Sequence, residues 1–173
     1  MKRTHNFPEN WPAPSEYLLE LGRMTSLWGA LENTVNIAIS QFAGFEGTSI
    51  DERALIMVVH SSFKQRVDII SSLCDWLLPE YPKLDNYKAV ITKIREAQMA
   101  RNKFAHNAIT LHGDSSQVMM GIASARGTLK TGTEIVQIDD IKEATAKIHE
   151  AMCALYALVT GNEINPIWER DEQ

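Results

Sequence analysis

The longest regular apolar pattern of the chain lies at residues 15–43, which read SEYLLELGRMTSLWGALENTVNIAISQFA. Its apolar side chains follow one another at alternating steps of three and four residues: Leu21, Met24, Trp28, Leu31, Val35, Ala38 and Phe42. Such steps place side chains on one face of an α-helix. Ser15 is expected to cap this helix, with Glu16 in its first turn. We therefore predict a helix over about 15–43, built to bury one face.

Two more helices are expected in the middle of the chain. Residues 52–78 have apolar positions at helical spacing, Asp51 precedes them as an N-cap, and the pattern allows a break near residues 60–62. Pro79 and Pro82 should end this stretch, because proline cannot continue the backbone hydrogen-bond ladder. The next helix should begin near residues 84–86 and end around Asn107.

The character of the sequence changes after residue 108. Residues 109–111, 118–122 and 134–138 are short β-prone runs, and residues 113–116 with Gly127 and Gly132 are expected to form turns between them. Asp139 should then cap a last helix that ends at Gly161. The sequence predicts a mainly α fold, a helical bundle with a small antiparallel β-sheet or hairpin inserted before the last helix.

Composition favours one globular domain without a membrane segment. Of the 173 residues, 45% are hydrophobic and 23% charged, and no apolar run reaches the roughly 18 to 20 residues that a bilayer requires. We expect an extended N-terminal arm over 1–14, one helical domain over 15–161 and an acidic tail over 162–173. Cys74 and Cys153 fit buried free thiols better than a disulfide, which with the lack of a secretory signal predicts a cytoplasmic protein.

Charge is unevenly distributed along the chain. The net charge of −5 argues against a protein that coats nucleic acid by bulk electrostatics. Residues 85–107 nevertheless carry five lysines and arginines against two acids, whereas the tail from Gly161 carries four acids against one arginine. A basic helix on an acidic body suits a small anionic target better than a long duplex.

That basic helix contains the sequence Arg101-Asn102-Lys103-Phe104-Ala105-His106, in which a histidine follows an arginine by five positions and an amide follows the arginine directly. It resembles the signature of the HEPN superfamily, in which four to six residues separate an arginine from a histidine and the residue after the arginine is typically polar. The layout of residues 15–160 is also similar: a long first helix with a tryptophan followed by Leu31-Glu32, the motif near the end of an inner helix, a β-prone excursion and a closing helix.

The resemblance implies a metal-independent endoribonuclease that acts as a homodimer, with catalytic residues Arg101, Asn102 and His106, RNA as substrate and no cofactor or metal. A histidine can exchange protons near neutral pH, and a guanidinium can hold a phosphate and stabilise developing charge. Toxin or phage-defence roles follow as expectations, with an antitoxin or regulatory protein as partner. Ala108 stands where many such toxins carry a modified tyrosine, so that form of regulation is not expected.

The spacing raises a geometric question. On an ideal helix Asn102 and His106 lie about 40° apart, but Arg101 and His106 lie about 140° apart and cannot both point at one substrate atom. Either the helix ends near Ala105 and releases the histidine, or two copies meet and each site draws residues from both chains.

Ordinary structural roles compete with the catalytic interpretation. Arg101 could pair with a buried carboxylate such as Glu32, and His106 could cap carbonyls at the helix C-terminus. The alternative function is a non-catalytic HEPN-like dimer that binds a nucleotide, RNA or a protein partner. The other histidines, His5, His60, His112 and His149, show no metal-ligand spacing, so no zinc site is predicted.

Overall fold

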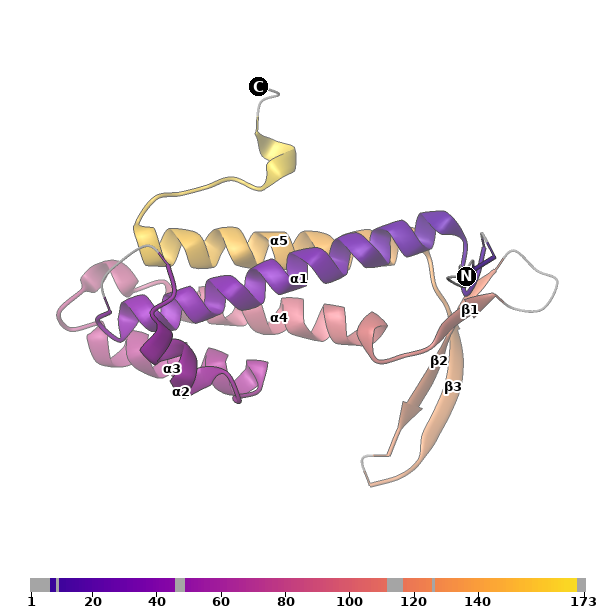
Figure 1. Ribbon diagram of the computed structural model, residues 1–173, viewed down its shortest axis with the longest axis horizontal. Coiled ribbons are helices and arrows are strands. Elements are labelled where there is room, and N and C mark those ends of the chain that lie inside the picture. The colour runs from indigo at the N-terminus through magenta and orange to yellow at the C-terminus, as the bar shows by residue number, and fades with distance from the viewer. Residues whose placement is uncertain (1–6, 9, 46–48, 112–116, 126, 171–173) are drawn as a thin grey trace, which may run out of the picture.

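The computed structural model describes residues 7–8, 10–45, 49–111, 117–125 and 127–170. The described elements are α1 (Ser15–Phe42), α2 (Glu52–Val58), α3 (Phe63–Leu77), η1 (Pro82–Leu84), α4 (Tyr87–Ala105), β1 (Ile109–Leu111), β2 (Val118–Ser124), β3 (Lys130–Ile135), α5 (Ile138–Thr160) and η2 (Ile167–Glu169). The long helices α1, α4 and α5 lie side by side, with α3 against α1 and α4 (Figure 1). The fold is mainly helical with a small sheet before the last helix, as the sequence predicted.

The apolar stripe of α1 forms the centre of the core. Met24, Trp28, Leu31, Val35 and Ala38 are all buried, as the spacing predicted. The Trp28 ring packs against Phe63 of α3, with 4.4 Å between the ring centroids. Most of the stability of a helix this long comes from burying such a stripe rather than from intrinsic helix propensity.

The predicted N-cap of α1 is wrong by one residue, although the helix begins at Ser15 as expected. The N-cap is Pro14, whose carbonyl accepts hydrogen bonds from the backbone N–H groups of Tyr17 and Leu18 at 3.0 and 3.1 Å. Proline suits this position because its fixed φ, here −55°, is compatible with entry into a helix and it has no N–H to leave unpaired. Ser15 is therefore the first helical residue rather than the cap.

The predicted break in the second helical stretch is confirmed. Asp51 caps α2 by accepting a hydrogen bond from the Arg53 backbone N–H at 2.8 Å. A new cap then starts α3: the Ser62 hydroxyl accepts from the Gln65 backbone N–H at 3.3 Å, and the Gln65 side chain accepts from the Ser62 backbone N–H at 2.8 Å. Because this reciprocal capping box fixes a new helix start, residues 59–62 separate two helices.

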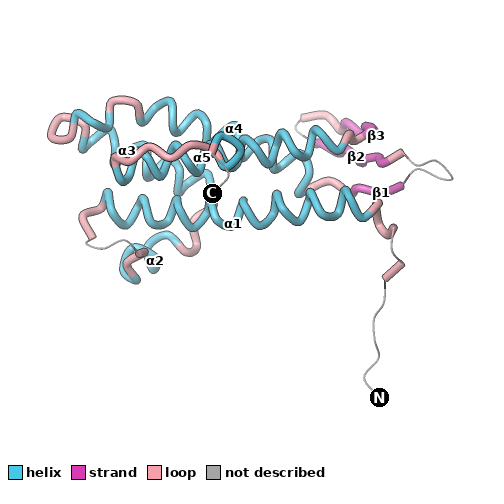
Figure 2. Tube along the Cα trace, turned by 90° about the horizontal axis from the view of Figure 1, so that it is seen from above, coloured by secondary structure: helices cyan, strands magenta, loops and turns pink. Residues whose placement is uncertain are grey.

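The sheet lies where α4 ends and α5 begins, at one end of the bundle (Figures 1 and 2). Its strand order is β1-β2-β3 and both pairings are antiparallel. The third strand is Lys130–Ile135 rather than the predicted 134–138, because β2 pairs with it from Ser124↔Lys130 to Met119↔Ile135 around a turn with Gly127 at φ +81°. Gly132 lies inside β3 rather than in a turn, and residues 113–116 lie outside the described part.

The last helix also begins differently from the prediction. Its N-cap is Gln137, whose backbone N–H donates to the Asp140 carboxylate at 3.3 Å, while Asp139 pairs with Lys142 at 3.1 Å inside the first turn. The acidic pair therefore follows the cap, where it complements the positive end of the helix dipole. Gly161 ends the helix in the left-handed conformation with φ +73°, as predicted.

Both cysteines are buried and unpaired, as the sequence favoured. Burial raises the pKa of the Cys74 thiol to about 11. No helix in the described part of the chain combines the length and the apolarity that membrane crossing requires.

Candidate active site at the end of α4

The end of α4 decides where the motif side chains lie. The helix ends at Ala105, and His106 leaves it with φ −113° and ψ 1°. The Asn107 side-chain amide donates to the Lys103 carbonyl at 2.7 Å and so satisfies a carbonyl of the last turn. Asn107, and not His106 as the structural alternative suggested, therefore caps the Lys103 carbonyl. The His106 ring contacts Arg101 instead.

The three motif side chains meet within one chain. Arg101 Nη1 lies 3.3 Å from His106 Nε2 and donates to Asn102 Oδ1 at 3.2 Å. An ideal helix would hold Arg101 and His106 about 140° apart. Because the helix stops one residue before His106, the backbone turns the ring back towards Arg101. This is the first of the two arrangements that the spacing allowed, and it needs no second copy.

The guanidinium of Arg101 has a further contact with α1. Its central carbon lies 5.2 Å from the centroid of the Trp28 ring, within the range of a cation–π interaction. Trp28 is only 6% exposed and is itself held by Phe63. The arginine of the motif therefore stacks on a rigid part of the core, which restricts its orientation.

Arg101 does not form the suggested pair with Glu32. The Glu32 carboxylate accepts instead from Arg66 Nη2 of α3 at 3.2 Å, and Arg66 Nη1 donates to the side-chain oxygen of Asn36 at 2.9 Å. The contacts of Arg101 are to an amide oxygen, an imidazole nitrogen and an aromatic ring, and no carboxylate among the described residues pairs with it. An uncompensated guanidinium at a surface favours binding of an anion such as phosphate.

Exposure and hydrogen bonding define what the cluster can do chemically. His106 is exposed, while Arg101 and Asn102 are partly buried. A guanidinium N–H can only donate, so in a hydrogen bond across the 3.3 Å contact Nε2 of His106 is the acceptor. The arrangement therefore places an imidazole nitrogen directly beside the guanidinium.

The sequence did not predict that Trp28 and Lys103 belong to this site. Trp28 was identified as a core position and as part of the family layout, but not as the platform for Arg101. Lys103, between Asn102 and Phe104, forms an ion pair with Glu134 of β3 at 2.6 Å, which links the end of α4 to the hairpin. Neither contact has a sequence signal, because each joins residues more than 30 positions apart.

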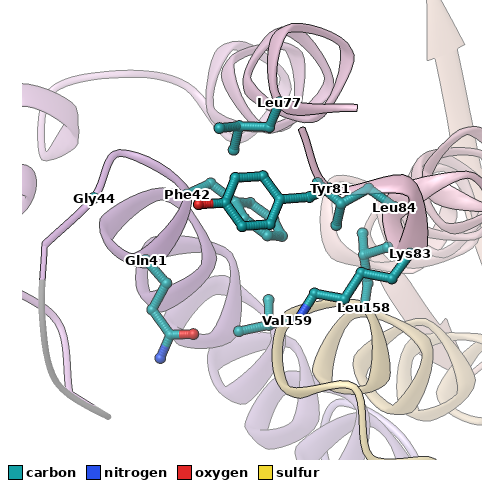
Figure 3. A pocket seen from close by; sticks show the side chains of 9 residues that line it. All are labelled: Gln41, Phe42, Gly44, Leu77, Tyr81, Lys83, Leu84, Leu158 and Val159. Carbon is teal, nitrogen blue, oxygen red and sulfur yellow. The ribbon is translucent and has the colours of Figure 1, made fainter. Parts of the chain in front are cut away.

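The cavity drawn in Figure 3 lies near the start of α4. It encloses about 280 Å³ and is lined by side chains from the ends of α1, α3 and α5 and from residues 81–84, among them Phe42, Leu77, Tyr81 and Leu158. Leu84, which also lines it, precedes the start of α4 at Tyr87, and Arg101 lies 14 residues, or about 21 Å, further along that helix. The motif residues belong to an open surface at the other end of the bundle.

Comparison of the chain with models of known protein families, with curated proteins and with solved structures gives no significant match. In the described part of the chain, no three His, Cys, Asp or Glu side chains gather as a candidate metal site. The geometry at the end of α4 is therefore the feature from which a function can be inferred.

Proposed function

We propose that this protein is a HEPN-type, metal-independent endoribonuclease that acts as a homodimer. The observation that carries the proposal is the contact of Arg101 Nη1 with His106 Nε2 at 3.3 Å, where no carboxylate of the described residues pairs with Arg101. A guanidinium and an imidazole lie side by side, which are the groups needed to bind a phosphate and to remove a proton next to it.

Each motif residue has a defined role in the proposed reaction. When the RNA phosphate binds the guanidinium of Arg101, it replaces His106 as a partner and releases Nε2. His106 Nε2 then takes the proton of the ribose 2′-hydroxyl, the 2′ oxygen bonds to phosphorus, and the bond from phosphorus to the 5′ oxygen breaks. An imidazolium returns a proton to that 5′ oxygen, and Asn102 positions the phosphate. The products are a 2′,3′-cyclic phosphate and a 5′-hydroxyl, so DNA is not a substrate.

A second copy would supply the acid that the leaving oxygen needs, because one histidine cannot be base and acid in the same step. Met99 lies three residues before Asn102 on α4 and is 67% exposed. The neighbouring helix α3 is joined to α4 by the ion pair of Arg95 with Asp68 at 2.9 Å. A two-fold contact through the side of α4 that carries Met99 and Asn102 would place the motif-bearing ends of the two α4 helices next to each other.

A toxin or phage-defence effector is the biological role that such an enzyme would serve, with an antitoxin or regulatory protein as its partner. The alternative is a non-catalytic HEPN-like dimer that binds a nucleotide, RNA or a protein. Arg101 contacts Asn102, His106 and Trp28 of its own chain. If these contacts serve to stabilise the fold, they favour the non-catalytic alternative. Mutation of His106 separates the two functions, since an exposed ring contributes little to stability.

The deciding experiment incubates the purified protein with a mixed RNA pool in the presence of a chelator, beside His106→Ala. The proposal expects cleavage by the wild type with 2′,3′-cyclic phosphate ends, and no cleavage of the matching DNA. His106→Ala should lose cleavage and keep its melting temperature. His60→Ala is the matched control, because His60 is also exposed but lies between α2 and α3.

Absence of cleavage by the wild type across several RNA pools would overturn the enzymatic proposal. Cleavage by His106→Ala at the wild-type rate would overturn the assignment of the base. A melting temperature that falls strongly in His106→Ala would instead favour the structural role and the binding function.

A further inference from the structure

The segment that follows α5 doubles back over that helix (Figure 1). We call residues 162–170 the strap. The Ile167 backbone N–H donates to His149 Nε2 of α5 at 3.0 Å, and the Trp168 ring meets the His149 ring edge to face, with 5.4 Å between centroids. Arg170 Nε donates to the Asn165 carbonyl at 2.8 Å and closes the strap on itself. One histidine therefore makes the central contacts between strap and helix.

His149 is an unusual residue for this position. It is only 7% exposed, although it is polar and lies in the middle of a helix. Its Nδ1 is buried without a hydrogen-bond partner, whereas Nε2 has the Ile167 N–H and lies 3.8 Å from the Cys153 sulfur. A buried polar atom without a partner is costly. The interaction that offsets this cost is the hydrogen bond that Nε2 accepts from the Ile167 N–H of the strap.

The hydrogen bond fixes the protonation state of this ring. A backbone N–H can only donate, so Nε2 must be unprotonated and the neutral ring carries its proton on Nδ1. A second proton would place an N–H of the ring against the N–H of Ile167 and would leave two donors without an acceptor. The closed strap therefore excludes the imidazolium.

The charges around His149 also oppose a cation. Burial lowers the pKa of the ring, and Arg170 on the strap lowers it further, while Glu150 on α5 acts in the opposite direction. Across the groove, the Glu20 carboxylate of α1 is paired with Arg23, and Lys142 of α5 is paired with Asp139. The thiol of Cys153, whose pKa is raised chiefly by burial, stays neutral beside the ring. Opening the strap would remove Arg170 from the ring and would expose the ring to water.

A hollow lies beneath the strap. The groove between α1 and α5 encloses about 600 Å³, and its wall includes Leu27 of α1 and Ala146 of α5 together with Ile167 and Trp168 of the strap. Ile167 is 64% and Trp168 52% exposed, so the strap covers the groove without filling it. Few apolar contacts hold the strap, which makes the His149 hydrogen bond a large part of its attachment.

We propose that the strap is a pH-sensitive cover of the α1–α5 groove, held closed by neutral His149 and released when that ring takes up a proton. The proposal is independent of the ribonuclease activity, because the groove is lined by none of the motif residues. In the open state, Trp168 and the apolar side chains of the groove become accessible together.

The pH dependence of strap opening follows from the linkage between opening and proton binding by His149. The closed state lowers the pKa of His149 below its usual value of 6.5, so the closed state binds fewer protons than the open one. Acid therefore favours opening. The opening equilibrium constant should rise as the pH falls through about 6.5, by at most about tenfold per pH unit, and should level off below the pKa of the closed state.

The test is nuclear magnetic resonance of the full chain between pH 7.5 and 5. Protection of the Ile167 amide against hydrogen exchange, corrected for the intrinsic pH dependence of exchange, should fall with the same midpoint as the ¹⁵N shifts of the His149 ring. In His149→Gln the side chain cannot titrate, so this transition should disappear. His60→Gln, at an exposed histidine far from the strap, should keep it.

Constant protection of Ile167 down to pH 5 in the wild type would overturn the proposal, as would an unchanged transition in His149→Gln. If His149→Gln fails to fold by near-ultraviolet circular dichroism, the wild-type titration alone decides. Different midpoints for the His149 ring and the Ile167 amide would then reject the switch.

Discussion

Arg101 contacts a ring face, an amide oxygen and an imidazole nitrogen at the same time. Only a planar, delocalised cation can use its face and its edge in this way. The face rests on Trp28, which leaves the edge directed at Asn102 and His106. At the scale of single residues, the site is an oriented guanidinium beside an imidazole.

Arg101→Lys tests this orientation, because lysine keeps the charge but loses the planar fork and the stacking. Cleavage should fall by roughly a hundredfold, as when one donor to a developing anion is removed. The melting temperature should fall by no more than about 4 °C, since an exposed cation–π contact contributes about 1 kcal/mol. Arg95→Lys is the control, because its exposed pair with Asp68 is worth at most about 1 kcal/mol. Wild-type cleavage by Arg101→Lys would contradict the role of the guanidinium.

Helix ends do most of the positioning at the scale of elements. The stop of α4 at Ala105 turns His106 towards Arg101, and the start of α3 at Ser62 places Phe63 against the Trp28 ring. Both ends are set by polar side chains that satisfy orphan backbone groups, Asn107 in the first case and the Ser62–Gln65 capping box in the second.

Ser62→Ala should destabilise the protein by about 1 kcal/mol, because the Gln65 backbone N–H loses its acceptor. For a chain of this size that corresponds to a fall in melting temperature of about 2 to 4 °C in a calorimetric scan. Ser72→Ala is the matched control on the same helix, where the hydroxyl donates to the Asp68 carbonyl in the helix interior. Equal melting temperatures for Ser62→Ala and the wild type would show that the capping box is dispensable.

The surface of the whole molecule differs from one face to another. Helix α4 carries the motif and the exposed Met99, and α3 carries the exposed Trp76. The groove between α1 and α5 is covered by the strap, and the sheet extends the end of the bundle where α4 stops (Figures 1 and 2). Large exposed apolar side chains beside a polar cluster are typical of interfaces. Self-association through the α4 face is therefore a property to test on the intact chain.

If the proposed dimer forms through Met99, Met99→Glu should convert it into a monomer and abolish the proposed cleavage, because two carboxylates would oppose each other at a two-fold contact. Light scattering coupled to gel filtration should give twice 19.5 kDa for the wild type and 19.5 kDa for the variant. Met57→Glu is the control, since Met57 of α2 is exposed to a similar degree, 62% against 67% for Met99. A wild type that is monomeric at working concentrations, or a dimeric Met99→Glu, would reject this interface.

Much of the fold was determined by local pattern. The steps of three and four from Leu21 to Phe42, the break at residues 59–62 and the glycine at 161 each depend on neighbours within a few positions, so the sequence alone predicted the helices and the antiparallel strands. The errors were at ends. Pro14 displaced Ser15 as the cap of α1, Gln137 displaced Asp139 at α5, and β3 came earlier because its register follows β2.

The sequence by itself also pointed to Arg101, Asn102 and His106 as a set, through the resemblance of this segment to the HEPN signature. Only the tertiary structure decided how they meet and what surrounds them: Arg101 on Trp28 rather than beside Glu32, Glu32 with Arg66, and His149 under a strap 18 residues further along the chain. The reason is physical. Periodicity fixes which side of a helix a residue occupies, but the partner of a side chain depends on how separate helices pack, which short-range patterns do not encode.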